Sequence, residues 1–139
     1  MAPDPERVRQ VRLWFEKTEE DLRAITVGLG ATPPLLGDAG FHVEQAAEKA
    51  MKGFLIWHDI PFAKTHDLVA VGNACIGVDA TLAPVVQDVG PLTEYAWRYR
   101  YPGKPETALT PGRVREGEAI ARSIYAAVLQ RLPLEVRPK

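Results

Sequence analysis

Apolar side chains recur every three or four residues along five stretches of the chain, which is the spacing of one face of an α-helix. The first stretch covers residues 6–27, with charged residues on its other face. Its apolar stripe contains Val8, Val11, Phe15, Thr18, Leu22 and Ile25, and its charged face contains Glu16, Lys17, Glu19, Glu20, Asp21 and Arg23. Gly28 and Gly30 follow, and glycines commonly end helices. The pattern therefore predicts a first helix over 6–27.

A second predicted helix covers residues 38–58, after a Pro-rich connector over 31–37, and Asp38 is expected to cap its first amides. Its segment FHVEQAAEKAMKG divides into an apolar side with Val43, Ala46, Ala47, Ala50, Met51 and Phe54 and a polar side with Gln45, Glu48, Lys49 and Lys52. Leu55 and Ile56 continue the polar side as apolar residues. We therefore expect this helix to be covered on two faces and to lie centrally.

A short helix is predicted over 66–75, with Thr65 as its cap. A longer helix is predicted over 82–99, and it must bend or restart at Gly90-Pro91 because proline lacks the amide hydrogen. Its stripe contains Leu82, Val85, Val86, Val89, Leu92, Ala96 and Tyr99.

The last predicted helix begins at Thr110-Pro111, a cap followed by a first-turn proline. Its stripe contains Val114, Gly117, Ala121, Ile124, Val128 and Leu132. Because no stretch alternates β-branched and polar residues and no Asn-Gly hairpin occurs, the sequence predicts an all-α fold. We expect an antiparallel up-and-down bundle of four long helices plus one short helix.

The length of 139 residues fits one domain over 1–139, with a core over about 6–132. A formal net charge of −1 gives no global attraction to nucleic acid or anionic lipid. The single cysteine, Cys75, excludes an intramolecular disulfide, and the three histidines give none of the usual zinc spacings, so neither a metal nor a cofactor is expected. No apolar run reaches the roughly 18 residues of a membrane span, and no signal core is present, so we expect a cytoplasmic protein with no membrane partner.

Several motifs occur in a fixed order along the chain. They are Trp14, Lys17 and Asp21-Leu22, then Phe41-His42, Gln45-Ala46-Ala47-Glu48-Lys49 and Lys52, then Lys64-Thr65-His66-Asp67-Leu68, then Arg100-Tyr101-Pro102. This set resembles the HEPN domain family, in its small prokaryotic single-domain form, over about residues 10–103. The resemblance implies a helical bundle that pairs as a homodimer and acts with nucleotides or RNA. It also implies a minimal nucleotidyltransferase as partner, in a two-component unit similar to toxin–antitoxin pairs.

A large subset of this family are metal-independent endoribonucleases with an arginine followed four to six residues later by a histidine. Here the histidines, at positions 42, 58 and 66, all precede Arg98 and Arg100, so the motif is missing. The imidazole that would exchange protons with the ribose 2′-hydroxyl and the leaving oxygen is therefore absent from that place. The sequence favours a non-catalytic binding partner with no catalytic residue assigned, and leaves an endoribonuclease toxin and a purely structural dimeric scaffold as alternatives.

The candidate nucleotide- or RNA-binding residues are Arg98, Arg100, Tyr101, Gln45, Lys49 and Lys52. Arg100 is suited to holding a phosphate while Tyr101 stacks on a base. Alternatively, Arg100 pairs with a carboxylate such as Glu48 or Asp67, or caps the end of its helix. The aromatic residues Tyr95, Trp97, Tyr99 and Tyr101 favour a core or dimer interface at this end of the chain.

The polar side of the second helix has two interpretations. On an exposed helix, Glu48 and Lys52 form an ordinary pair four residues apart. If the side is covered, its charges need partners, and we expect Arg100 to meet Glu48 and a phosphate to meet Lys49. For His66-Asp67 we favour a helix start over a catalytic base with its carboxylate, because neighbours in sequence rarely face each other.

Overall fold

The computed structural model describes residues 2–96, 98–99, 101–102 and 109–139. In these residues the chain forms helices and no strand, which confirms the all-α prediction. The α-helices are α1 (Pro5–Gly30), α2 (Leu36–Trp57), α3 (Leu68–Val78), α4 (Ala83–Val86) and α5 (Pro111–Gln130). Three 3-10 turns accompany them: η1 (Ala80–Leu82), η2 (Gly90–Ala96) and η3 (Leu134–Val136).

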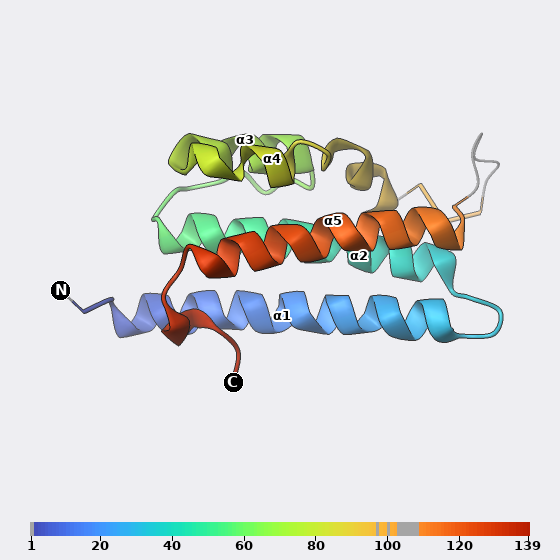
Figure 1. Cartoon of the computed structure of the whole chain (residues 1–139), viewed down its shortest axis with the longest axis horizontal. Coiled ribbons are helices and arrows are strands. Elements are labelled where there is room, and N and C mark those ends of the chain that lie inside the picture. The colour runs from blue at the N-terminus through green and yellow to red at the C-terminus, as the bar shows by residue number, and fades with distance from the viewer. Residues whose placement is uncertain (1, 97, 100, 103–108) are drawn as a thin grey trace.

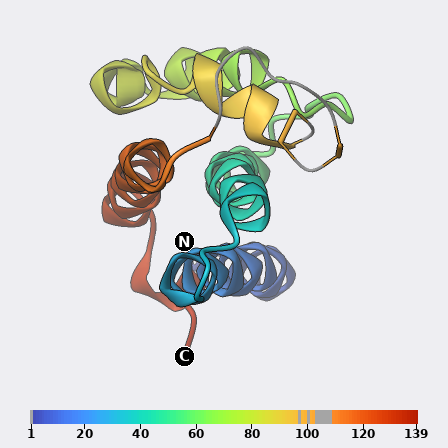
Figure 2. The same cartoon turned by 90° about the vertical axis from the view of Figure 1, so that its right-hand side faces the viewer.

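The helices form a bundle in which α2 and α5 lie side by side in the middle (Figure 1). Seen from the end, α1 covers one side of this pair, and α3, α4 and η2 cover the other (Figure 2). α1 runs against α2, as expected for an up-and-down bundle. The central place predicted for the second helix is confirmed, since α2 contacts α1, α3, η2 and α5.

The core lies between these layers and is made of the side chains that the periodic pattern predicted to be buried. It includes Val11, Phe15, Leu22 and Ile25 of α1, Val43, Ala47, Met51 and Phe54 of α2, Leu82, Val86, Val89 and Leu92 of the fourth segment, and Val114, Ala121, Ile124 and Val128 of α5. Burying these stripes against one another stabilises helices that would be marginal alone in water.

Glycines bring α1 and α2 close together. A Cβ placed on Gly53 of α2 would lie 2.5 Å from Cε1 of Phe15, and a Cβ on Gly28 of α1 would lie 3.2 Å from Cβ of Ala39. The prediction that Gly28 and Gly30 lie beyond the first helix is therefore wrong. Both lie inside α1, and the residue after the helix, Ala31, is extended with φ of −69°. Gly28 permits a close helix contact and does not end the helix.

Three other predicted boundaries can be compared with the structure. α2 begins at Leu36 without a side-chain cap, so Asp38 lies in its first turn instead of capping it. Asp67, not Thr65, caps α3, because its Oδ1 accepts from the amides of Val69 at 3.1 Å and Ala70 at 3.4 Å. The cap of α5 is confirmed, since Thr110 Oγ1 accepts from the Arg113 amide at 3.1 Å.

The fourth segment is shorter and more broken than its apolar stripe indicated. The predicted helix over 82–99 consists of α4, which has 4 residues, and η2, which begins at Gly90. Pro91 has no amide hydrogen to continue the α-helix through this point. η2 is fixed to the start of α3 because the Leu68 amide donates to Thr93 Oγ1 at 3.2 Å. Among the described residues, no helix combines the length and the apolar character needed to cross a membrane.

Candidate functional site

The polar side of α2 is covered, and its charged residues belong to two clusters. The Asp21 cluster consists of Asp21 from α1 with His42 and Lys49 from α2. The Glu44 cluster consists of Glu44, Glu48 and Lys52 from α2 with His66 from the connector between α2 and α3. The side that looked like one row in the sequence is therefore two sites with different partners.

In the Asp21 cluster, both carboxylate oxygens have partners. His42 Nδ1 lies 2.7 Å from Asp21 Oδ1, and Lys49 Nζ donates to Asp21 Oδ2 at 2.7 Å. The side chain of Asp21 is 8% exposed, and those of His42 and Lys49 are 23% exposed. One carboxylate meets one ammonium, so the cluster is balanced in charge when the imidazole is neutral.

In the Glu44 cluster, Glu48 Oε1 has two partners. His66 Nδ1 lies 2.7 Å away and donates to it when Glu48 is ionised, and Lys52 Nζ lies 3.5 Å away. Lys52 also donates to the Thr65 carbonyl at 3.0 Å and lies 5.2 Å from the centre of the Phe62 ring. The side chains of Glu48 and Lys52 are 5% and 9% exposed, whereas that of His66 is 69% exposed.

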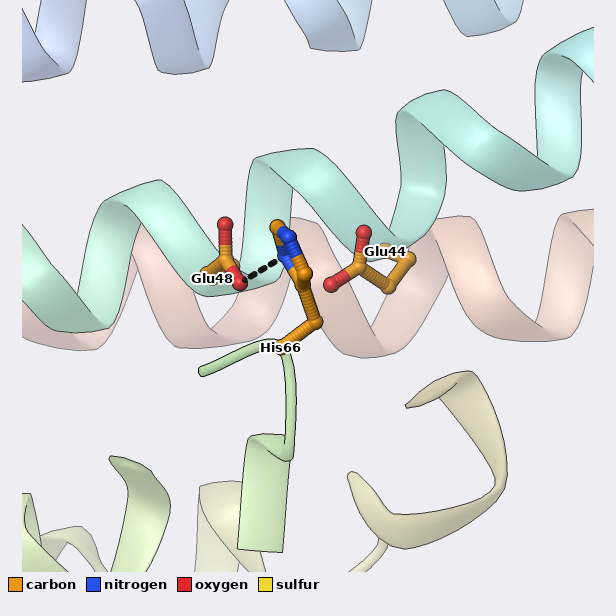
Figure 3. Close-up of side chains that lie close together, drawn as sticks. All are labelled: Glu44, Glu48 and His66. Atoms are coloured by element: carbon orange, nitrogen blue, oxygen red, sulfur yellow. Dashed lines mark hydrogen bonds and ion pairs between the residues drawn. The ribbon is translucent and has the colours of Figure 1, made fainter. Parts of the chain in front are cut away.

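Glu44 is the least satisfied member of this cluster. It is fully buried, its Oε2 accepts from Gln45 Nε2 at 2.6 Å, and its Oε1 has no hydrogen-bond donor in the described part of the protein. Burial, reinforced by the Glu48 carboxylate and opposed by the Gln45 hydrogen bond, raises the pKa of Glu44 to about 7. Figure 3 shows the His66 ring between the carboxylates of Glu44 and Glu48.

The turn after α2 brings His66 to this position. α2 ends at Trp57, and Asp59 takes a left-handed conformation with φ of 57°. The Ile60 amide then donates back to the Leu55 carbonyl at 2.9 Å. The chain continues alongside α2, so that Phe62, Thr65 and His66 reach its polar side. Ion pairs on α2 thus depend on a connector that follows it.

A groove lies between α1 and α2 beside the Asp21 cluster. It has a volume of about 530 Å³ and is lined by Lys17, Glu20, Asp21, Arg23, Ala24, Val27, Gly28, Leu35, Asp38, His42 and Lys49. Val27 and Leu35 are large apolar residues that stay exposed here. The groove therefore combines basic groups, carboxylates and apolar surface.

The candidate residues near η2 are only partly described. Arg98 Nη1 lies 2.8 Å from Glu94 Oε2, and its guanidinium carbon lies 5.9 Å from the Tyr99 ring centre. Tyr101 is 69% exposed. Arg100 and Trp97 lie outside the described residues, so the pairing predicted between Arg100 and Glu48 or Asp67 falls there too.

Tyr95 gives the aromatic end of the chain a role in the core. Its ring lies against Gly40 of α2 and Gly117 of α5, where an added Cβ would come within 3.7 Å and 3.1 Å of it. Of the two roles predicted for the aromatic residues, Tyr95 takes the core role.

The sequence analysis missed the partners of the covered charges. It placed Asp21 on the exposed face of α1, which is wrong, since Asp21 is 6% exposed. A signal existed, because Asp21 lies three residues after Thr18 and four before Ile25, both of which belong to the apolar stripe. The described partner of Lys49 is Asp21, and the partners of Glu48 are His66 and Lys52.

Comparison with protein-family models gives one match, to the HEPN domain, over residues 11–132. No curated protein and no solved structure matches the chain. The matched range runs from the first turns of α1 to the residues just after α5, so it includes both clusters and the groove.

Proposed function

The chain belongs to the HEPN domain family, and on that premise we propose that it is a nucleotide- or RNA-binding module and not a nuclease. HEPN is a family linked to nucleotides and RNA, and its domains commonly dimerise. The proposed module pairs as a homodimer and works with a small nucleotidyltransferase in a two-component, toxin–antitoxin-like unit. It acts in the cytoplasm.

The groove between α1 and α2 is the observation that carries this proposal. Lys17, Arg23 and Lys49 line it and supply positive charge for phosphate groups. The ammonium of Lys49 has three hydrogens, and its described bond to Asp21 uses one, so donors remain for a phosphate oxygen. The exposed apolar surface of Val27 and Leu35 suits the face of a base.

The remaining candidate residues take different parts in the proposal. Tyr101 is well exposed, which suits stacking on a base, and Arg98 and Arg100 flank it on one side in the sequence. Gln45 and Lys52 contact Glu44 and the Thr65 carbonyl, so we assign them to the interior of the Glu44 cluster and not to the ligand.

A second candidate function, RNA cleavage, is favoured by one observation. The His66 ring is exposed, and the buried Glu48 carboxylate holds its Nδ1 at 2.7 Å. A carboxylate in this position fixes the tautomer of an imidazole, which leaves Nε2 as an acceptor for a proton. This arrangement provides a general base without the missing arginine–histidine motif.

Fluorescence anisotropy with labelled single-stranded RNA and labelled ATP tests the first proposal. Replacing both Lys17 and Arg23 by Ala is expected to weaken binding at least about tenfold, since phosphate contacts dominate affinity for nucleic acids. Arg9→Ala is the matched control, because Arg9 is an exposed arginine of α1 outside the groove and is paired with Glu6. Equal binding by the three proteins, or no binding of either ligand, would overturn the groove proposal.

The same RNA separates binding from cleavage. We expect it to remain intact after prolonged incubation with the wild-type protein. Cleavage that disappears in His66→Ala would replace the binding proposal with the ribonuclease alternative. A nucleotidyltransferase reading frame beside this gene, with a product that co-purifies with this protein, would support the proposed partnership.

A further inference from the structure

Three metal-ligand groups meet on the outer side of α2. Glu44 and Glu48 are one helical turn apart, so their side chains project from the same face. His66 approaches them from the connector after α2 (Figure 3). One potential ligand atom from each residue lies within 4.8 Å of those from the other two.

Glu44 supplies the second, independent observation. It is 0% exposed, yet its Oε1 has no hydrogen-bond donor among the described residues. Buried polar atoms are rarely left in that condition, because removing a carboxylate oxygen from water without a partner is costly. The carboxylate points toward the His66 ring in Figure 3, so the unpartnered group faces the other two ligands.

Charge balance points the same way. When both carboxyls are ionised, Glu44 and Glu48 carry two negative charges against the single positive charge of Lys52. The ammonium of Lys52 lies 3.5 Å from Glu48 Oε1, and its hydrogen bond goes to the Thr65 carbonyl, so it opposes a further cation only in part. A divalent ion would give the buried Glu44 the positive partner that it lacks.

We propose that Glu44, Glu48 and His66 bind a divalent transition-metal ion, with Zn²⁺ as the best match. Two carboxylate oxygens and one imidazole nitrogen form a donor set that suits such ions, and three protein ligands leave a coordination position for water. On binding at Nδ1, the imidazole hydrogen moves to Nε2, and any proton held by Glu44 is released to solvent. The exposed His66 side of the cluster is the route of entry.

The Asp21 cluster is a natural control for this site. It has the same imidazole–carboxylate distance of 2.7 Å, but it contains one carboxylate, and Lys49 occupies the second oxygen of that carboxylate. It therefore offers neither a second acidic ligand nor an unpartnered oxygen. None of the three proposed ligands lines the groove between α1 and α2, so metal binding and nucleotide binding stand or fall separately.

Isothermal titration calorimetry of the EDTA-treated, desalted protein with ZnCl₂ tests the proposal. We expect one Zn²⁺ per chain in the wild type. Glu44→Gln keeps the size of the side chain and His66→Ala changes an exposed side chain, so both variants should fold, which circular dichroism checks. Each should weaken Zn²⁺ binding at least about tenfold, whereas His42→Ala should leave it unchanged.

Three results would overturn the proposal. They are no Zn²⁺ binding by the wild type, equal affinities in the wild type and the two ligand variants, and loss of binding in His42→Ala. A second measurement covers a misfolded variant. Zn²⁺ should raise the melting temperature of the wild type and of His42→Ala, because an ion that binds only the folded state stabilises it. The absence of that rise in both proteins would equally contradict the site.

Discussion

The Asp21 cluster and the Glu44 cluster are built on the same helix around the same contact, an imidazole Nδ1 held 2.7 Å from a carboxylate oxygen. Each also contains a lysine, Lys49 in the first and Lys52 in the second. They differ in the number of acids. The Asp21 cluster has one carboxylate with both oxygens engaged, whereas the Glu44 cluster has two carboxylates and an unpartnered oxygen on Glu44.

This difference separates a structural ion pair from a candidate binding site. Where each charged group meets its opposite, the cluster fixes α1 against α2 and needs nothing else. Where a second buried acid is added without a second cation, folding leaves an interaction unmade, which an ion from solvent is able to make. Similar contacts in the two clusters therefore do not imply similar roles.

The largest expected effect comes from breaking the balanced cluster. Asp21→Asn removes the charge that Lys49 and His42 share and turns an amide donor toward one of them. We expect the free energy of unfolding to fall by about 3 kcal/mol at pH 8, because hydrogen bonds to a buried charge are lost and Lys49 stays partly buried. Urea unfolding followed by circular dichroism measures it. A change below about 1 kcal/mol would mean that the cluster is not a structural ion pair.

The same acid-to-amide change in the other cluster should have the opposite sign. Folding raises the pKa of Glu44 from 4.5 to about 7, so the folded state favours the protonated carboxyl. The group costs nothing at a pH below its unfolded value, and the cost grows as the pH rises from 4.5 to about 7. Glu44→Gln should therefore stabilise the metal-free protein by about 2 kcal/mol at pH 8, after allowance for its buried amide hydrogens, and hardly at pH 4.5.

Urea unfolding of both proteins in EDTA, across the same pH range, checks this prediction. Glu48, Lys52 and His66 are the charged or titratable groups that act on Glu44 and are present in both proteins, so their own titration largely cancels in the difference. A Glu44→Gln variant that is less stable than the wild type at pH 8 would show that the Glu44 charge is satisfied after all.

The smallest effect should come from the imidazoles. His42→Ala removes a side chain that is 23% exposed and tied to Asp21, and we expect a loss of about 1 kcal/mol. His66→Ala removes one that is 69% exposed, and we expect less than about 0.5 kcal/mol in the absence of metal. Chemical denaturation of the two variants side by side gives the difference. The reverse order would contradict the division into a structural cluster and an open one.

The fold was predictable because its main signal is local. Periodic stripes identified every buried helical face, and the all-α bundle is confirmed. The errors arose where one residue type has several uses. Gly28 permits the close approach of Ala39 and does not end α1, and Pro91 breaks the fourth segment into short turns instead of only bending it. Local pattern alone does not distinguish these uses.

The candidate site was predictable only in part. The covered polar side of α2, with Lys49 and Lys52, follows from the apolar residues farther along the same side. The partners do not follow, because they come from other elements: Asp21 lies 28 residues from Lys49, and His66 lies 18 residues from Glu48. The unpartnered oxygen of Glu44 depends on how tightly these elements close over it. Helical spacing does not contain that information.

The central claim is that Glu44 is a buried carboxylate without a compensating partner. Side-chain carboxyl carbon-13 shifts of the metal-free protein, followed by NMR through a pH titration, test it most directly. We predict one glutamate that titrates near pH 7, that disappears in Glu44→Gln, and that ionises at lower pH when Zn²⁺ is added. If every glutamate titrates below a pH of about 5, Glu44 is compensated in the folded protein and the claim is wrong.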